Sequence, residues 1–222
     1  MLVLISGLPR AGKSSFADRL EREQGFTHVP LDRYIKEVST GMAFLDWVAT
    51  PACIDWTLLG LHLDHLRQGR SCFAPQPDWQ KGGKRVSQGG LECGGRRMSP
   101  STYGYVIPGC HAYRIPEPGA HVYKIFMQTP HGVIAERISR RSVSESEAPD
   151  ILDQNLSKNW RTIEAYAEEA DLILSGTVSP SSQMKKFCCR LSAATLARNL
   201  IRPAPRSRFG SVSRLPSTSP SS

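Results

Sequence analysis

The sequence lacks the features that mark membrane-spanning, secreted and zinc-binding proteins. No apolar stretch approaches the roughly 18 residues that cross a membrane. No positively charged segment precedes the short apolar run Leu2–Ile5, so we expect no signal peptide and a cytoplasmic location. The six cysteines form no C-x-x-C pair and have no zinc-site spacing with histidine, which favours reduced thiols.

Acidic residues are absent from the last part of the chain. Between Pro180 and Ser222 there are eight lysines and arginines but no aspartate or glutamate, whereas the other 20 basic residues balance all 20 acidic ones. Balanced charge in residues 1–177 gives no support to a specific nucleic-acid partner. The segment 178–222 is rich in serine, proline and arginine, and we expect it to be disordered, with a short basic helix over Phe187–Ile201 as the alternative.

Apolar runs of strand length alternate with stretches of helical periodicity. This alternation predicts an α/β fold of three layers, in which a mostly parallel sheet has helices on both faces. The expected strands are Leu2–Ser6, Phe26–Leu31, Tyr105–Ile107, Val122–Met127 and Ala170–Leu174. The expected helices are Lys13–Gln24, one that Asp55 caps and Gly69 closes, one that Thr129 caps and that runs from Pro130 as its first residue to about Arg141, and Ile151–Glu169.

These elements predict one domain over residues 1–177. Residues 75–104 are rich in glycine, and a loop of this length in a compact domain is usually functional or disordered. Residues 130–150 combine a helix with a polar connector, which we interpret as a lid.

Residues 7–14, GLPRAGKS, fit the phosphate-binding pattern G-x-x-x-x-G-K-[ST]. Its glycines permit backbone angles that let successive N–H groups point at phosphate oxygens. A chance match in a glycine-bearing turn is the alternative, but the preceding strand and the following helix are the context of a genuine nucleotide site. The predicted ATP contacts are Gly7, Pro9, Arg10, Ala11, Gly12, Lys13, Ser14 and Ser15, of which Ser14 also ligates Mg²⁺.

Asp32 follows the second expected strand, in VPLDRYIKE. Ligands of open α/β sheets bind at the carboxyl ends of strands, so a carboxylate there can accept the proton of an attacking hydroxyl or hold a magnesium ion through water. A helix N-cap is the alternative role for this aspartate.

The stretch ERISRR contains three arginines, Arg137, Arg140 and Arg141. On a helix they could form a solvated face in which Glu136 pairs with Arg140. Because forked guanidinium groups also suit a lid that closes over a transferring phosphoryl group, we favour the lid.

Six stretches resemble the uridine kinases and their phosphoribulokinase relatives, in the same order along the chain. They are GLPRAGKSS, LDRYIKE, TPACIDWTLLGLHLDHLRQGR, PQPDWQKGGKR, VIPGCHAY and TPHGVIAERISRR, and the resemblance extends from about Met1 to Leu174. It implies that Lys13 contacts phosphates, that Asp32 activates the acceptor hydroxyl, and that Arg137, Arg140 and Arg141 belong to the lid. It also implies acceptor contacts at Tyr34, Asp78 and Arg85.

Two prolines depart from the pattern of that family. Pro77 stands where the family has the tyrosine of a Tyr-Asp pair, and Pro108 stands where it has a magnesium-binding glutamate. Proline supplies no carboxylate, so Mg²⁺ must rely on Ser14, Asp32, phosphates and water. His111, just beyond, is a candidate contact to the acceptor, with a purely structural role as the alternative.

The sequence therefore predicts an ATP- and Mg²⁺-dependent phosphotransferase that moves the γ-phosphoryl group to a hydroxyl of a small molecule. The resemblance favours a nucleoside, and the altered motif Pro77-Asp78-Trp79 admits another alcohol. Pro108 supports the alternative of a catalytically impaired nucleotide-binding regulatory or scaffold protein. A nucleic-acid-dependent NTPase would rest on the basic tail alone, and no membrane partner or oligomeric state is predicted.

Overall fold

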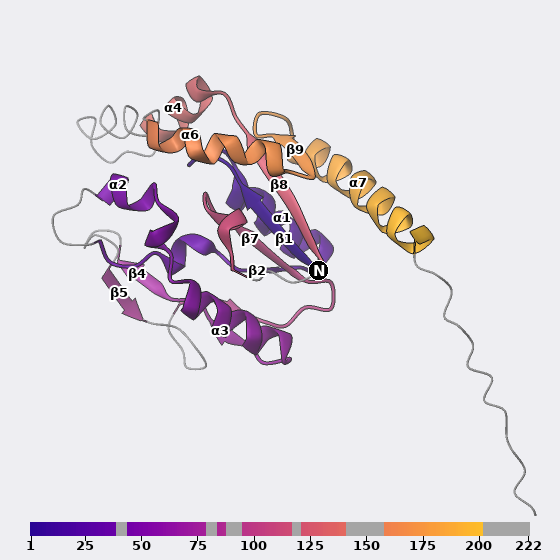
Figure 1. Ribbon diagram of the computed structural model, residues 1–222, viewed down its shortest axis with the longest axis horizontal. Coiled ribbons are helices and arrows are strands. Elements are labelled where there is room, and N and C mark those ends of the chain that lie inside the picture. Colours follow the sequence, from indigo (N-terminus) through magenta and orange to yellow (C-terminus); the bar gives the residue numbers. More distant parts are fainter. Residues whose placement is uncertain (39–43, 79–83, 88–94, 117–120, 141–157, 202–222) are drawn as a thin grey trace, which may run out of the picture.

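Five parallel strands form the central sheet of the computed structural model, which describes residues 1–38, 44–78, 84–87, 95–116, 121–140 and 158–201 (Figure 1). Every neighbouring pair of these strands is parallel, as the sequence predicted. In spatial order the strands are β2 (Thr27–His28), β7 (Tyr105–Pro108), β1 (Leu2–Ser6), β8 (Val122–Gln128) and β9 (Leu172–Ser175).

Helices cover both faces of this sheet, so the predicted three layers are confirmed. Along β1, Leu2 and Leu4 face one apolar cluster, and Val3 and Ile5 face the other, because successive strand residues point to opposite faces. Both faces of a parallel sheet are normally buried in this way. One layer contains α1 (Lys13–Gln24) and α7 (Pro180–Ile201), and the other contains α3 (Trp56–Arg67), α4 (His131–Ser139) and α6 (Lys158–Glu164).

The folded part of the chain extends beyond residue 177, which corrects the predicted boundary. Helix α7 packs onto the sheet through Met184 and Phe187, and the Phe187 ring meets Phe16 of α1 with ring centroids 5.9 Å apart. Burial of one such aromatic side chain contributes about 2–3 kcal/mol. The prediction of disorder relied on the basic charge of this segment and overlooked its apolar face. The helix also starts at Pro180, seven residues before the predicted alternative at Phe187. Residues 202–222 lie outside the described ones.

The second strand is shorter than predicted. It covers only Thr27–His28, and a 3₁₀ helix begins at Leu31. Pro30 lies between them and has no N–H to donate to a strand ladder. The chain therefore leaves the sheet before Asp32.

The glycine-rich stretch 75–104 contains short strands rather than an unbroken loop. The strands β4 (Gln76–Asp78) and β5 (Lys84–Ser87) pair antiparallel, and β6 (Arg97–Met98) pairs with β3 (Cys72–Phe73). Residues 79–83 and 88–94 lie outside the described part of the chain.

Several predicted boundaries shift by a few residues. Asp55 caps α3 as predicted, since its carboxylate accepts a hydrogen bond from the Leu58 N–H at 3.0 Å. Pro130 is the N-cap of α4 and not its first helical residue, and α4 ends at Ser139. The described part of the predicted helix 151–169 comprises α6 and a 3₁₀ turn at Ala165–Glu169. Among the described residues, the structure has no helix that combines the length and the apolarity of a membrane span.

Candidate active site

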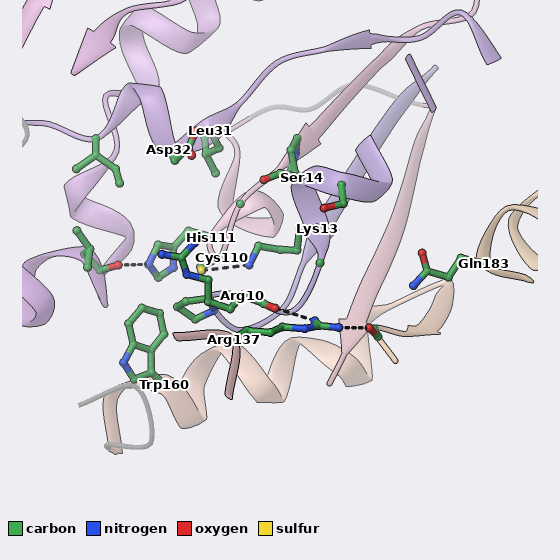
Figure 2. A pocket seen from close by; sticks show the side chains of 18 of the residues that line it. Arg10, Lys13, Ser14, Leu31, Asp32, Cys110, His111, Arg137, Trp160 and Gln183 are labelled. Atoms are coloured by element: carbon green, nitrogen blue, oxygen red, sulfur yellow. Dashed lines mark hydrogen bonds between the residues drawn. The ribbon is translucent and has the colours of Figure 1, made fainter. Parts of the chain in front are cut away.

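A cavity of about 940 Å³ lies beside the loop that follows β1. The sheet order places β1 between β7 and β8, so this loop occupies the point where connections diverge to the two sides of the sheet. Ligands of open α/β sheets bind in the crevice at such a point. Figure 2 shows side chains from several elements around the cavity, and the lining includes Pro9, Arg10, Gly12, Lys13, Ser14, Ser15, Asp32, His111, Arg137 and Arg140.

The loop has the backbone geometry of a phosphate-binding loop. Gly7 and Gly12 have φ angles of 140° and 104°, and Arg10 has a φ of 62°. A Cβ atom on Gly7 would lie 2.4 Å from the Met127 carbonyl oxygen, so no other residue fits there. When residues with positive φ angles alternate with residues with negative φ angles, consecutive N–H groups turn toward one point, where an anion binds. Gly7 and Ala11 shape the loop from behind and do not line the cavity.

The Lys13 ammonium lies on the carbonyl groups of its own loop. It donates to the Gly7 oxygen at 2.8 Å and to the Leu8 oxygen at 2.6 Å, and its Nζ lies 3.6 Å from the Cys110 sulfur. The side chain is buried, yet it lines the cavity beside Ser14. The positive charge of Lys13 therefore lies at the start of α1, where the helix dipole also favours a bound anion.

Arg137 of α4 joins the phosphate-binding loop to the segment after β9. Its guanidinium donates to the Arg10 oxygen at 2.9 Å and to the Gly176 oxygen at 2.7 Å. The Thr129 hydroxyl adds a third link, since it donates to the Ala11 oxygen at 3.0 Å instead of capping α4. Arg137 thus lines the cavity as a clamp on backbone carbonyls.

The other predicted lid arginines differ from Arg137. Arg140 pairs with Glu136 at 2.6 Å on the exposed face of α4, as the solvated-face alternative expected, and it also lines the cavity. Arg141 lies outside the described residues. The solvated-face alternative therefore describes Arg140, whereas Arg137 binds backbone carbonyls and its role in a lid stays a prediction.

Asp32 lines the cavity from the side of β2. It lies inside the 3₁₀ helix Leu31–Tyr34, whose N-cap is Pro30, so the alternative of an N-cap aspartate is wrong. Its side chain is exposed, and within the described residues its carboxylate has no hydrogen-bond partner. A free carboxylate at this position is available to a ligand.

His111 is a buried histidine that lines the same cavity. Its Nε2–H donates to the Val48 carbonyl oxygen at 3.0 Å, which assigns the proton to Nε2 and leaves a lone pair on Nδ1. That Nδ1 has no partner in the described part of the chain. Burial lowers the pKa of His111, and the cations of Lys13 and Arg114 lower it further, so the imidazole is neutral at pH 7.

Of the three residues that the resemblance assigned to the acceptor, Tyr34 is the one whose side chain the structure describes, and it is not brought into this cavity. Tyr34 is fully buried, and its hydroxyl lies 2.8 Å from Nδ1 of His62 in the core. Asp78 and Arg85 belong to the β4–β5 hairpin, where the backbone of Arg85 is paired with that of Pro77. The positions of the Asp78 and Arg85 side chains lie outside what the structure describes.

The residues at the end of β7 leave a limited donor set for a divalent cation. Pro108 lines the cavity where the expected family has a carboxylate. The Ser14 hydroxyl and the Asp32 carboxylate line the same cavity, and Asp32 has no competing bond among the described residues. Mg²⁺ is usually held by one or two carboxylates with phosphates and water, so this donor set fits the ion.

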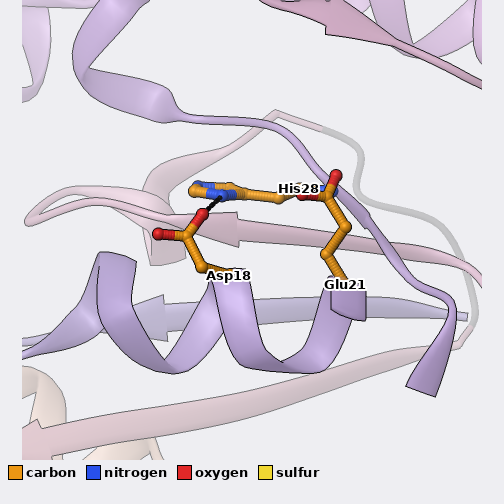
Figure 3. Close-up of side chains that lie close together, drawn as sticks. All are labelled: Asp18, Glu21 and His28. Carbon is orange, nitrogen blue, oxygen red and sulfur yellow. Dashed lines mark hydrogen bonds and ion pairs between the residues drawn. The ribbon is translucent and has the colours of Figure 1, made fainter. Parts of the chain in front are cut away.

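A separate cluster of Asp18, Glu21 and His28 lies between α1 and β2 (Figure 3). Its ligand atoms lie within 4.8 Å of one another, but the Arg96 guanidinium already pairs with both carboxylates. The His28 imidazole lies 2.8 Å from Asp18, and burial and the Arg96 charge lower its pKa. The cluster is therefore an ion-pair network that links α1 to the chain at residue 96, away from the cavity.

Sequence reasoning missed the far end of the cavity. Its lining there comes from the segment after β9 and the first turn of α7, namely Gly176, Thr177, Val178, Pro180 and Gln183. Residues that follow a parallel strand are candidates for ligand contact by position alone. That signal was present at the end of the predicted strand 170–174, but the residues from 178 onward were assigned to a tail.

Comparison with solved structures identifies the fold. A sugar kinase from Janibacter sp. is 14% identical, with 88% of this chain and 96% of that chain covered and a TM-score of 0.52. The chain has a P-loop NTPase fold. An identity this low shows the fold alone.

Two further kinases are similar at a lower level of superposition. A gluconokinase from Sinorhizobium meliloti is 14% identical, covers 89% of this chain and 94% of its own, and has a TM-score of 0.49. A possible uridine kinase from Bacillus stearothermophilus is 18% identical, covers 78% and 88%, and has a TM-score of 0.46. No family model and no curated protein matches the sequence.

Proposed function

We propose that this protein is an ATP- and Mg²⁺-dependent phosphotransferase of the small-molecule kinases, a divergent relative of the uridine kinases. The observation that carries the proposal is a single cavity that contains a phosphate-binding loop at one point and, at another, the Asp32 carboxylate, which has no partner among the described residues. A loop alone would support nucleotide binding only. A free carboxylate at the neighbouring strand end adds a group that can activate a hydroxyl.

The nucleotide phosphates occupy the loop in this proposal. The backbone N–H groups of residues 10–14 and the Lys13 ammonium neutralise their charge, and Arg137 holds the loop in place from α4. Catalysis is then mainly positioning and charge stabilisation, as phosphoryl transfer requires.

The acceptor lies on the Asp32 side of the loop. Its hydroxyl oxygen attacks the γ-phosphorus, the bond from that phosphorus to the β–γ bridging oxygen breaks, and ADP leaves. The hydroxyl proton passes to the Asp32 carboxylate. The neutral His111 lines the same cavity and is a candidate contact to the acceptor.

Ser14 and Asp32 are the side chains that would hold Mg²⁺. When bound, the ion supplies positive charge to the oxygens of the β- and γ-phosphates. Pro108 adds nothing to this site, so phosphate oxygens and water complete the coordination.

Release of ADP across a panel of alcohols tests the proposal. Uridine and cytidine come first, followed by sugars, sugar phosphates, glycerate and vitamin precursors with a primary hydroxyl. We expect one class to raise the rate of ADP release above the acceptor-free rate, and Lys13→Ala to lower the stimulated rate at least about 10²-fold. Lys185→Ala removes an exposed lysine of α7 and serves as the control.

Pro108 favours a second candidate, a nucleotide-binding protein that has lost catalysis and serves as a regulator or scaffold. In that case ATP binds, Lys13→Ala abolishes binding, and no acceptor stimulates turnover. That combination of results would overturn the phosphotransferase proposal and keep the nucleotide site.

A further inference from the structure

Apolar side chains line the end of the cavity beside Asp32. Figure 2 shows Asp32 and His111 on the opposite side of the cavity from Gln183. Two segments of chain supply the apolar lining there, one at the 3₁₀ helix after β2 and one that runs from the end of α2 (Phe44–Val48) to the start of α3. This lining, hereafter the acceptor wall, consists of Leu31, Ile35, Val48, Cys53 and Ile54. An acceptor whose hydroxyl reaches Asp32 therefore has this wall beside it.

Backbone hydrogen bonds join the two segments of the acceptor wall. Ile35 and Ile54 form an antiparallel bridge, and the Lys36 N–H donates to the Cys53 carbonyl oxygen at 2.7 Å. The Cys53 sulfur in turn lies 4.0 Å from the Val48 carbonyl oxygen. Because main-chain bonds hold the two segments together, the wall has its shape before any ligand binds.

Burial keeps the acceptor wall uncharged. It raises the pKa of the Cys53 thiol to about 12, with a further contribution from the neighbouring Cys110, so this thiol is protonated at pH 7. The Nε2–H of His111 is already bonded to the Val48 carbonyl oxygen, 3.0 Å away. Ile35 and Val48 are only partly buried, so they present apolar surface to the cavity. Such surface is covered most favourably by an apolar part of a ligand.

The charged side chains of the described lining lie at different places. The cations are Arg10 and Lys13 at the phosphate-binding loop and Arg137 and Arg140 on α4, whereas Asp32 beside the acceptor wall is an anion. A carboxylate repels a second anion, so a sugar acid or a sugar phosphate gains no favourable charge from this wall. A polyol is also disfavoured, because hydroxyls set against carbon atoms lose hydrogen bonds to water and gain none.

We propose that the acceptor is an uncharged alcohol with an apolar aliphatic or aromatic body, which the acceptor wall binds while Asp32 receives the hydroxyl. The inference rests on the proposed function, since it needs phosphoryl transfer at the Asp32 end. The alcohol oxygen bonds to the γ-phosphorus, ADP keeps the electron pair of the bond that breaks, and Asp32 takes the hydroxyl proton. Nucleosides, sugars and sugar acids are then poorer acceptors than apolar alcohols.

Release of ADP by the full chain with ATP and Mg²⁺ tests the inference. The acceptors are straight-chain primary alcohols from ethanol to octanol, with uridine, ribose and glycerate in the same panel. Each added methylene covers more of the acceptor wall, so we expect kcat/KM to rise about two- to fourfold per methylene until the wall is filled. The best alcohol should exceed uridine, ribose and glycerate in kcat/KM.

Val48→Thr tests the contribution of the wall itself. Threonine has nearly the shape of valine, but its hydroxyl faces carbon atoms, so we expect kcat/KM for hexanol to fall at least about fivefold. Val122→Thr is the matched control, because Val122 of β8 is also partly buried against the same apolar cluster but does not line the cavity. It should leave kcat/KM for hexanol unchanged, and calorimetry with ATP shows that both variants fold and bind nucleotide.

Two results would overturn the inference and leave the phosphotransferase proposal standing. One is a higher kcat/KM for uridine, ribose or glycerate than for every straight-chain alcohol. The other is a kcat/KM that does not depend on chain length, or that Val48→Thr and Val122→Thr change equally. If no alcohol, sugar or nucleoside stimulates ADP release, the result contradicts the proposed function itself, and the acceptor class with it.

Discussion

The end of the cavity at the phosphate-binding loop and the proposed acceptor end are built from different parts of the chain. Around the loop, backbone groups make the contacts: Lys13, Thr129 and Arg137 all donate to main-chain carbonyls. At the acceptor end, the available groups are two side chains, Asp32 and His111, from elements that follow different strands. Backbone geometry constrains a short stretch of sequence tightly, whereas isolated side chains leave their surroundings free to vary. Four experiments test this comparison.

Asp32→Asn probes the acceptor end and should have the largest effect. The amide keeps the shape of the carboxylate but cannot accept a proton, so we expect the acceptor-stimulated rate to fall about 10²–10⁴-fold. Calorimetry with ATP in the absence of Mg²⁺ should give an unchanged affinity, because the phosphate contacts come from the loop. An equal loss of nucleotide affinity would show that the two ends are not separable.

Gly7→Ala probes the phosphate end. The new Cβ meets the Met127 oxygen at 2.4 Å, and a φ of 140° is closed to alanine, so we expect unfolding to become easier by about 3 kcal/mol or more. Urea denaturation measures the change. Gly60→Ala is the control: it lies inside α3 with no atom within 4 Å, and it should stabilise the protein by about 0.5–1 kcal/mol. A neutral Gly7→Ala would contradict the described loop geometry.

Arg137→Lys probes the clamp on the loop. Lysine has no fork and cannot reach the carbonyls of Arg10 and Gly176 together, so we expect a loss of about 1–2 kcal/mol in the free energy of unfolding. The control Arg67→Lys alters an exposed pair with Asp64 and should change stability by less than about 0.5 kcal/mol. Equal effects of the two variants would mean that the clamp adds nothing to the folded state.

The smallest of the four effects should be a fall in the free energy of unfolding at acidic pH, which arises from His111. Burial lowers the pKa of His111 below its usual value near 6.5, so on acidification the unfolded chain takes up the proton first. The free energy of unfolding should then fall below about pH 6.5, by at most about 1.4 kcal/mol per pH unit for one proton. The window closes at the lowered pKa of the folded state.

His111→Gln separates this contribution from that of His28, whose pKa burial also lowers. Urea denaturation at pH 7.0 and pH 5.8 should show a weaker pH dependence in His111→Gln than in the unsubstituted protein, and a still weaker one in a double variant with His28→Gln. A His111→Gln slope as steep as the original would refute a neutral, buried His111.

Much of the fold was predictable because its signals are local. The apolar run Leu2–Ser6 and the glycines of the loop carry their own patterns, and the Asp55 cap is visible within three residues. Predicted boundaries of helices were wrong where a contact with a residue distant in the sequence determined them. The Thr129 hydroxyl donates to the Ala11 carbonyl oxygen instead of capping α4 as predicted. Helix α7 is stabilised because Met184 and Phe187 pack on an apolar face of the sheet.

In the candidate site too, the local features were predictable, whereas the positions that depend on packing were not. The loop contacts were predicted from the nine residues 7–15, and the structure places six of the eight predicted phosphate-loop contacts at the cavity. Tyr34 could not be assigned in this way, because its burial against His62 depends on where α3 packs. Gln183 was missed for the same reason, since nothing near it in the sequence indicates a cavity.

The sequence by itself determined that the protein has a phosphate-binding loop between a strand and a helix, because φ angles and N–H directions in such a loop depend on its own glycines. Only the tertiary structure decided which groups share the cavity with that loop. Asp32, His111, Arg137 and Gln183 are far apart along the chain, and the order of the parallel strands brings them to one edge of the sheet. The chemistry of each side chain is fixed by its own residue type, but the packing of the fold determines which other side chains lie beside it.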